Sequence, residues 1–109
     1  MKNLDPIFIT IPEGLEAIVP DYLASRQEEV SELLRLLAAS DCDHIRVLAH
    51  NMKGSGGSYG FTRLTEIGAE MECSARESNV VALSQQIGSL TNYLERVRLQ
   101  PPAPIEYGI

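Results

Sequence analysis

The sequence predicts an all-α protein that folds as an up-down antiparallel four-helix bundle with a short N-terminal lead-in helix. Four stretches repeat apolar residues at the three- and four-residue spacing of amphipathic helices. The segments between them are short, so consecutive helices are expected to be antiparallel neighbours. The 109 residues suit one domain, with residues 1–12 as an extended lead-in, 13–100 as the bundle and 101–109 as a proline-rich tail.

The first long helix is expected from about Pro20 to Ala39. Pro20 suits a first helical turn, where its missing N–H is not needed. One apolar stripe follows, formed by Val30, Leu33, Leu34 and Leu37. The residues before it, 13–19, are predicted to form the lead-in turn, and the one strand-like run of the chain is residues 7–11.

The second helix is expected to begin near Asp41 or Asp43, either of which could cap it, and to end by the glycines near Gly60. On a helix of 100° per residue, its core face carries the residues within about 60° of Ile45. These are Leu48, Met52, Gly56 and Tyr59.

The last two helices show the most regular patterns. The third repeats apolar residues at spacings of three and four, namely Leu64, Ile67, Met71 and Ala75. The fourth opens near Asn79 and continues a heptad seam, which is typical of a helix in an antiparallel bundle. The seam consists of Val80, Leu83, Ile87, Leu90, Leu94 and Val97.

Composition excludes several classes of function. The formal charge of −6 argues against nucleic acid as a partner, and no basic amphipathic stretch suggests a membrane surface. The first residues are too short and polar for a signal peptide, so the cytoplasm is the expected compartment. Cys42 and Cys73 form no metal-binding or disulfide pattern, and both are expected to be small, semi-buried apolar residues.

The chemically informative residues lie on the outer face of the second helix. His50 falls about 140° from the core seam, with Lys53 one turn along. Gly54 and Gly57, at the fourth and seventh positions after His50, leave room around the ring. Imidazole is a nucleophile at neutral pH, and the ammonium of Lys53 could reach an anion attached to it.

These glycines need an explanation, because each one inside a helix disfavours it by roughly 1 kcal/mol relative to alanine. Close helix packing can explain Gly56, which falls on the core face. Gly54 and Gly57 do not face the core, and access to His50 explains them better.

The run HNMKGSGGSYGF resembles the motif of histidine-containing phosphotransfer (Hpt) domains, and the resemblance covers residues 12–99. The matching positions are His50, Lys53, Gly54, Ser55, Gly57 and Gly60. The next helix adds the family's apolar-then-acidic pattern at Leu64, Ile67, Met71 and Glu72. One departure is Gly68, where a larger small residue such as alanine would be usual; glycine there would permit close packing.

The resemblance implies a phosphocarrier without catalytic machinery of its own. His50 would accept the phosphoryl group, Lys53 would offset its charge, and Gly54 and Gly57 would clear the docking surface. Val47, one turn before His50, is a candidate apolar contact. The implied partner is a response-regulator receiver domain, a hybrid histidine kinase or both. The receiver would supply Mg²⁺, so no cofactor or metal is expected in this chain.

Two other functions remain open from sequence. The alternative is a non-catalytic helical adaptor that binds a signalling partner; its discriminating feature would be the loss of the acceptor, and this chain keeps His50 and Lys53. An enzyme would need a second acid or base placed near His50, and the sequence suggests none. Glu70 and Glu72 are most simply a solvated face.

Three smaller expectations complete the sequence analysis. His44 is expected on the surface near the start of its helix, too far around it from His50 to share a metal. Ser55 is expected to bond a carbonyl four residues back. A monomer is expected, because four helices can close a core without a partner.

Overall fold

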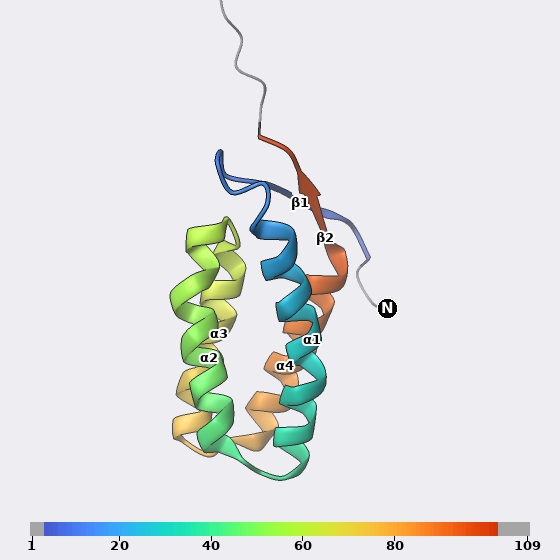
Figure 1. Ribbon diagram of the computed structural model, residues 1–109. Coiled ribbons are helices and arrows are strands. Elements are labelled where there is room, and N and C mark those ends of the chain that lie inside the picture. The colour runs from blue at the N-terminus through green and yellow to red at the C-terminus, as the bar shows by residue number, and fades with distance from the viewer. Residues whose placement is uncertain (1–3, 103–109) are drawn as a thin grey trace, which may run out of the picture.

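The computed structural model, described here for residues 4–102, is an up-down bundle closed at one end by two short strands (Figure 1). Its helices are α1 (Val19–Ala38), α2 (Cys42–Gly56), α3 (Thr62–Arg76) and α4 (Val80–Arg96). A 3₁₀ turn, η1 (Gly57–Tyr59), follows α2, and the strands are β1 (Ile7–Thr10) and β2 (Val97–Gln100). Within the described part of the chain, no helix is long and apolar enough to cross a membrane.

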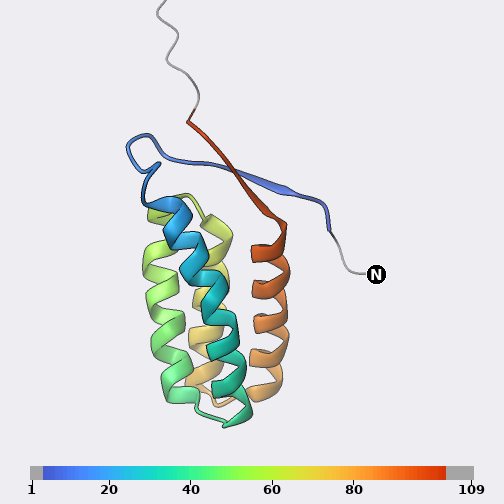
Figure 2. The ribbon, with the colours of Figure 1, turned by 45° about the vertical axis from the view of Figure 1, so that its right-hand side comes forward.

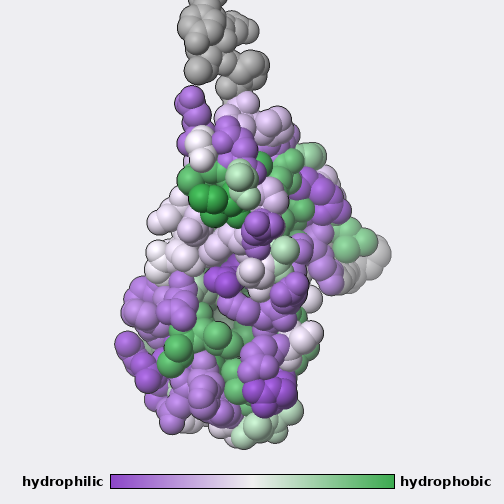
Figure 3. Space-filling view, viewed as in Figure 1, coloured by the Kyte–Doolittle hydropathy of each residue, from purple (hydrophilic) through white to green (hydrophobic). Residues whose placement is uncertain are grey.

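The predicted fold class is confirmed. Each helix packs against the next one along the chain, and α4 returns beside α1 (Figures 1 and 2). The core is mainly aliphatic, and the predicted apolar residues of α3 are all buried. The predicted stripe of α1 is wrong in part, because Leu36 is buried and Leu34 is exposed, and Val80 at the start of α4 is also exposed. The largest fully buried side chains include Phe61, Leu33, Ile45, Met52 and Leu64. Figure 3 shows a mostly hydrophilic face, with hydrophobic surface at the strand end of the bundle and in a second patch between α1 and α2.

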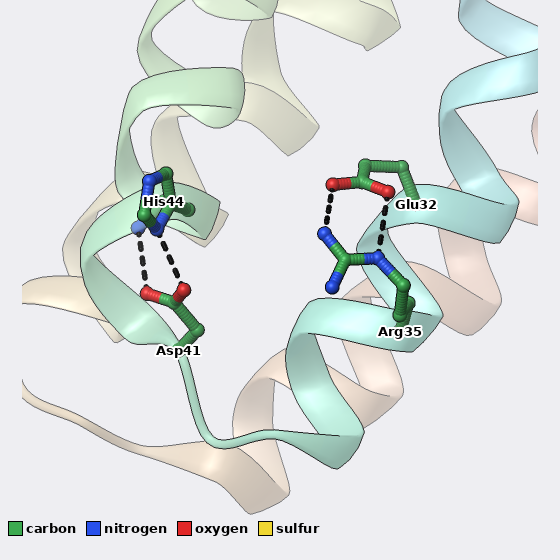
Figure 4. A network of polar contacts seen from close by, with 4 residues as sticks. All are labelled: Glu32, Arg35, Asp41 and His44. Atoms are coloured by element: carbon green, nitrogen blue, oxygen red, sulfur yellow. Dashed lines mark hydrogen bonds and ion pairs between the residues drawn. The ribbon is translucent and has the colours of Figure 1, made fainter.

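The turn from α1 to α2 shows why the chain reverses at Ser40. Ser40 adopts a left-handed φ of 53°, and its N–H and that of Asp41 bond back to the carbonyls of Leu37 and Leu36. This is the Schellman pattern of a helix end. Asp41 then caps α2 by accepting a hydrogen bond from the His44 N–H at 3.2 Å (Figure 4). The same arrangement recurs between α3 and α4 at Ser78 and Asn79.

Figure 4 also shows why His44 stays at the surface. Its Nδ1 lies 2.6 Å from Oδ2 of Asp41, and the side chain is 73% exposed. The backbone hydrogen bond from His44, together with that from its ring, holds the pKa of Asp41 below its ordinary value. His44 is therefore tied to the helix cap, and its predicted surface position is confirmed.

The prediction of a lead-in helix over residues 13–19 is wrong. The segment consists of turns, in which Leu15 N–H bonds to the Pro12 carbonyl and Ile18 N–H to the Leu15 carbonyl. Gly14 has a φ of +87°, in the left-handed region that a right-handed helix cannot include. The helix therefore starts only at Val19, with Pro20 in its first turn.

The prediction that Val97 continues the fourth helix is also wrong. Val97 is extended, with ψ of 133°, and begins β2. β2 pairs in parallel with β1, with Ile7 opposite Val97 and Thr10 opposite Gln100. The pairing joins residues 90 positions apart, so the apolar spacing within the fourth helix carried no sign of it.

Two further expectations meet different outcomes. Cys42 is buried as a small apolar residue, whereas Cys73 is exposed, because the outer side of α3 carries it away from the core. The division of the chain at residues 12 and 100 stays a prediction, and residues 103–109 of the expected tail lie outside the described residues.

Candidate functional site

His50 lies in the middle of α2 on its solvent side. Its side chain is 66% exposed, and that of Lys53, one turn along, is 46% exposed. Val47, one turn before, is 48% exposed. A Cβ added at Gly54 would meet no atom of the described residues within 4 Å, so the surface beside His50 is open. At Gly57 it would come no closer than 3.5 Å, to Oγ1 of Thr65.

A buried carboxylate lies directly under the imidazole. Oε2 of Glu72, on α3, is 2.5 Å from Nδ1 of His50. Its other oxygen, Oε1, lies 3.3 Å from Nζ of Lys53 and 3.7 Å from a guanidinium nitrogen of Arg76. The Glu72 side chain is only 4% exposed, although its three partners are all exposed. The Glu72 carboxylate therefore contacts the side chains of His50, Lys53 and Arg76 at once.

The contacts of Glu72 determine its charge and the tautomer of the ring. The hydrogen bond from His50, followed by that from Lys53, lowers the pKa of Glu72 against the opposing effect of burial. Glu72 is therefore ionised at neutral pH, and an ionised carboxylate can only accept hydrogen bonds. The Nδ1 atom of His50 must then carry the proton of this hydrogen bond, so in the neutral form of the ring the lone pair is on Nε2.

Two glycines let α3 approach α2 closely enough for this contact. A Cβ at Gly68 would lie 2.7 Å from the backbone nitrogen of Lys53 and 2.9 Å from the carbonyl oxygen of Ala49. A Cβ at Gly56 would lie 2.9 Å from the backbone nitrogen of Thr65. Glu72 follows Gly68 by one helical turn, so the close approach at Gly68 brings its carboxylate under His50. The packing reasons expected for Gly56 and Gly68 are confirmed.

The sequence analysis missed Glu72 as a site residue. It placed Glu72 on a solvated face and found no acid near His50, and both statements are wrong. Glu70 is solvent-exposed, with a contact of 3.6 Å to Arg63. A signal was present, because Glu72 lies one turn after Gly68 and next to the core residue Met71. The register of α3 against α2, which decides the contact, could not be obtained from one sequence.

Two predictions about neighbouring residues have clear outcomes. Oγ of Ser55 donates to the carbonyl of Asn51 at 2.9 Å, four residues back as predicted. It also lies 2.6 Å from the hydroxyl of Tyr22, on α1. Tyr59 is half-buried rather than part of the core, and it stacks on the ring of Tyr22 with centroids 4.3 Å apart.

Comparison with known proteins decides the family. A family model described as "Hpt domain" matches residues 17–100, which include all four helices and the His50 site. The chain belongs to the Hpt domain family. No curated protein and no solved structure matches it.

Membership of the Hpt family gives the chain a general role. Hpt domains are phosphocarrier modules that act in histidine phosphotransfer within two-component phosphorelays. Among residues 4–102 of this Hpt domain, no cluster of three His, Cys, Asp or Glu side chains could hold a metal ion.

The ionised state of Glu72 predicts how this Hpt domain responds to acid. Because the pKa of Glu72 is lowered on folding, its contribution to stability is present above its ordinary value of 4.5 and is lost as the pH falls through the lowered value. In urea titrations, the free energy of unfolding of the wild type is expected to exceed that of Glu72→Gln by more at pH 7 than at pH 3.

The matched control for the acid experiment is Glu70→Gln, an exposed carboxylate on the same helix. Its difference from the wild type is expected to change much less over the same range. A difference between the wild type and Glu72→Gln that stays constant from pH 7 to pH 3 would contradict an ionised Glu72 in the folded protein.

Proposed function

We propose that His50 carries the phosphoryl group, on Nε2, to or from the aspartate of a response-regulator receiver domain. The observation that carries the proposal is that only one of the two ring nitrogens, Nδ1, is bound within the protein. Nδ1 is bound by Glu72 inside the protein, while the ring is 66% exposed for an incoming partner. A hybrid histidine kinase is the other expected partner, and the cytoplasmic location stays a prediction.

The transfer step balances with the groups at the site. The lone pair of Nε2 attacks the phosphorus of the receiver's aspartyl phosphate, and an N–P bond forms. The P–O bond to the aspartate breaks, and the aspartate leaves as a carboxylate with the electron pair. The proton stays on Nδ1, so the ring becomes positively charged. The adjacent carboxylate of Glu72 stabilises that charge, as a carboxylate does for an imidazolium in hydrolases.

Lys53 and the open surface complete the proposed site. The ammonium of Lys53 pairs with Glu72 in the unmodified protein, and its partial exposure lets it turn toward a phosphoryl group on Nε2. Gly54 and Gly57 leave the approach to His50 clear, and the exposed side chain of Val47 offers an apolar contact beside it. In this proposal, these residues of the Hpt domain bind the receiver domain, and the receiver domain supplies the Mg²⁺.

The proposal is tested by mixing the protein with a phosphorylated receiver domain and Mg²⁺. We expect one phosphoryl group per chain, stable in base and labile in acid, located on His50 by fragmentation mass spectrometry. Phosphorylation at another residue would overturn the assignment of His50. No phosphorylation by any of several receivers or kinases, in a protein whose helical content is intact, would favour the adaptor alternative.

Substitution of Gly54 separates stability from docking. Gly54→Ala is expected to stabilise the protein by up to about 1 kcal/mol, because alanine is the better helix former and the site is open. It is also expected to slow transfer from the receiver, because the added methyl group lies on the approach to His50. Urea denaturation and the rate of transfer measure the two effects.

Gly88→Ala is the matched control, because Gly88 is helical and open to the same test, yet lies on α4. It is expected to raise stability in the same way and leave transfer unchanged. If Gly54→Ala transfers as fast as Gly88→Ala, Gly54 does not contribute to the docking surface.

A further inference from the structure

The end of α2 is made of weak helix formers, although the proposed function needs a defined backbone conformation there. Gly54, Gly56 and Gly57 follow Lys53 directly, and glycine is among the poorest helix formers. The helix nevertheless continues to Gly56 before it narrows into η1. The proposed function requires the backbone from Lys53 to Gly57 to keep one conformation, while the side chain of Lys53 turns toward the phosphoryl group and the surface stays open to a partner.

A hydroxyl group from α3 ties this segment together. Oγ1 of Thr65 accepts a hydrogen bond from the N–H of Gly57 at 2.8 Å and donates one to the carbonyl of Lys53 at 3.1 Å. These two backbone groups are four residues apart, as are the partners that close a turn of α-helix. The missing side chain at Gly56 makes room, since a Cβ there would lie 2.9 Å from Oγ1 of Thr65.

Residues of α3 therefore contact both the backbone and the side chain of Lys53. Thr65 bonds its carbonyl, and Glu72 pairs with its ammonium at 3.3 Å. Gly68, between them on α3, lies against the backbone nitrogen of Lys53. On the other side of α2, Ser55 bonds to Asn51 and to Tyr22, which ties the same turn to α1.

We propose that Thr65 is a positioning residue for phosphotransfer, which holds the backbone from Lys53 to Gly57 in the conformation that the receiver meets. The inference rests on the proposed function of His50. The hydroxyl of Thr65 bonds to backbone groups and not to the imidazole of His50 or the ammonium of Lys53, so it acts through the backbone. The glycines keep the surface open but disfavour the helical conformation. The two hydrogen bonds of the Thr65 hydroxyl stabilise that conformation.

The test compares Thr65→Val, which keeps the shape and loses the hydroxyl, with Thr65→Ser, which keeps the hydroxyl. Thr91→Val is the matched control, because Oγ1 of Thr91 also bonds a carbonyl, that of Ile87 at 2.8 Å, but on α4. Amide hydrogen exchange measures the order of residues 54–57, and transfer from a phosphorylated receiver measures the function.

In Thr65→Val, exchange at the Gly57 amide is expected to rise about 5- to 10-fold, the effect of losing about one hydrogen bond. The rate of transfer is expected to fall about 3- to 10-fold, because the docking surface is less well positioned. Thr65→Ser is expected to restore both quantities. Thr91→Val is expected to change neither.

The outcomes distinguish this inference from the proposed function. Unchanged exchange at the Gly57 amide in Thr65→Val would show that the bridge, the pair of hydrogen bonds from Thr65 to Lys53 and Gly57, does not order this segment. Faster exchange with an unchanged rate of transfer would overturn the positioning role. Both results leave His50 as the acceptor. If the wild type accepts no phosphoryl group, the proposed function fails and the positioning role for phosphotransfer fails with it. The exchange data would still show whether the bridge orders the segment.

Discussion

His50→Gln is expected to abolish phosphoryl acceptance, while His44→Gln accepts as the wild type does. The amide of glutamine can still bond to Glu72 but has no nucleophilic nitrogen. Because His50 bonds to the buried carboxylate of Glu72, and glutamine replaces that hydrogen bond only in part, the substitution is expected to destabilise the protein by about 0.5–1.5 kcal/mol. Labelling from a phosphorylated receiver, with thermal unfolding as a check of the fold, measures both.

His44 is an unusually close control for His50. Both histidines lie on α2, both are mostly exposed, and each has a carboxylate oxygen at Nδ1. They differ in their surroundings. The third and fourth residues after His50 are Lys53 and Gly54, whereas those after His44 are Val47 and Leu48. Label lost in both variants, or retained in His50→Gln, would show that the imidazole and its surroundings at residue 50 do not define the acceptor.

Gly68→Ala is expected to destabilise the protein by about 1–3 kcal/mol, as overpacking of a well-packed interface does. Its Cβ would lie 2.7 Å from the nitrogen of Lys53 and 2.9 Å from the carbonyl oxygen of Ala49. Both are backbone atoms, so no side-chain rotation can relieve the contact and the helices must separate. The free energy of unfolding from urea titrations measures this change.

The same separation is expected to weaken the contact between Glu72 and His50. We therefore expect Gly68→Ala to transfer more slowly than the wild type at a temperature where both are folded. Gly88→Ala, at an open helical position, is the control and is expected to gain stability. A stable Gly68→Ala variant with normal transfer would mean that α3 does not need to approach α2 so closely.

The sequence was sufficient for the elements whose signals are local. Apolar spacing predicted the four helices, and Pro20 marked the start of α1 to within a residue. For α2 the sequence offered Asp41 or Asp43, and the structure has Asp41 as the cap. The lead-in helix failed because the left-handed conformation of Gly14 is a property of the folded turn. The placement of Val97 failed because its strand partner, Ile7, lies at the other end of the chain.

The site divides along the same line. By itself, the sequence determined that His50, Lys53 and Gly54 share the outer face of one helix, because helical geometry fixes which residues lie together. Gly57, expected in the same helix, lies in the 3₁₀ turn η1 that follows it. Only the tertiary structure decided that a buried Glu72 binds Nδ1 and leaves Nε2 free. That contact depends on the register of two helices, which the backbone clearance at Gly68 and Gly56 sets and no local pattern records.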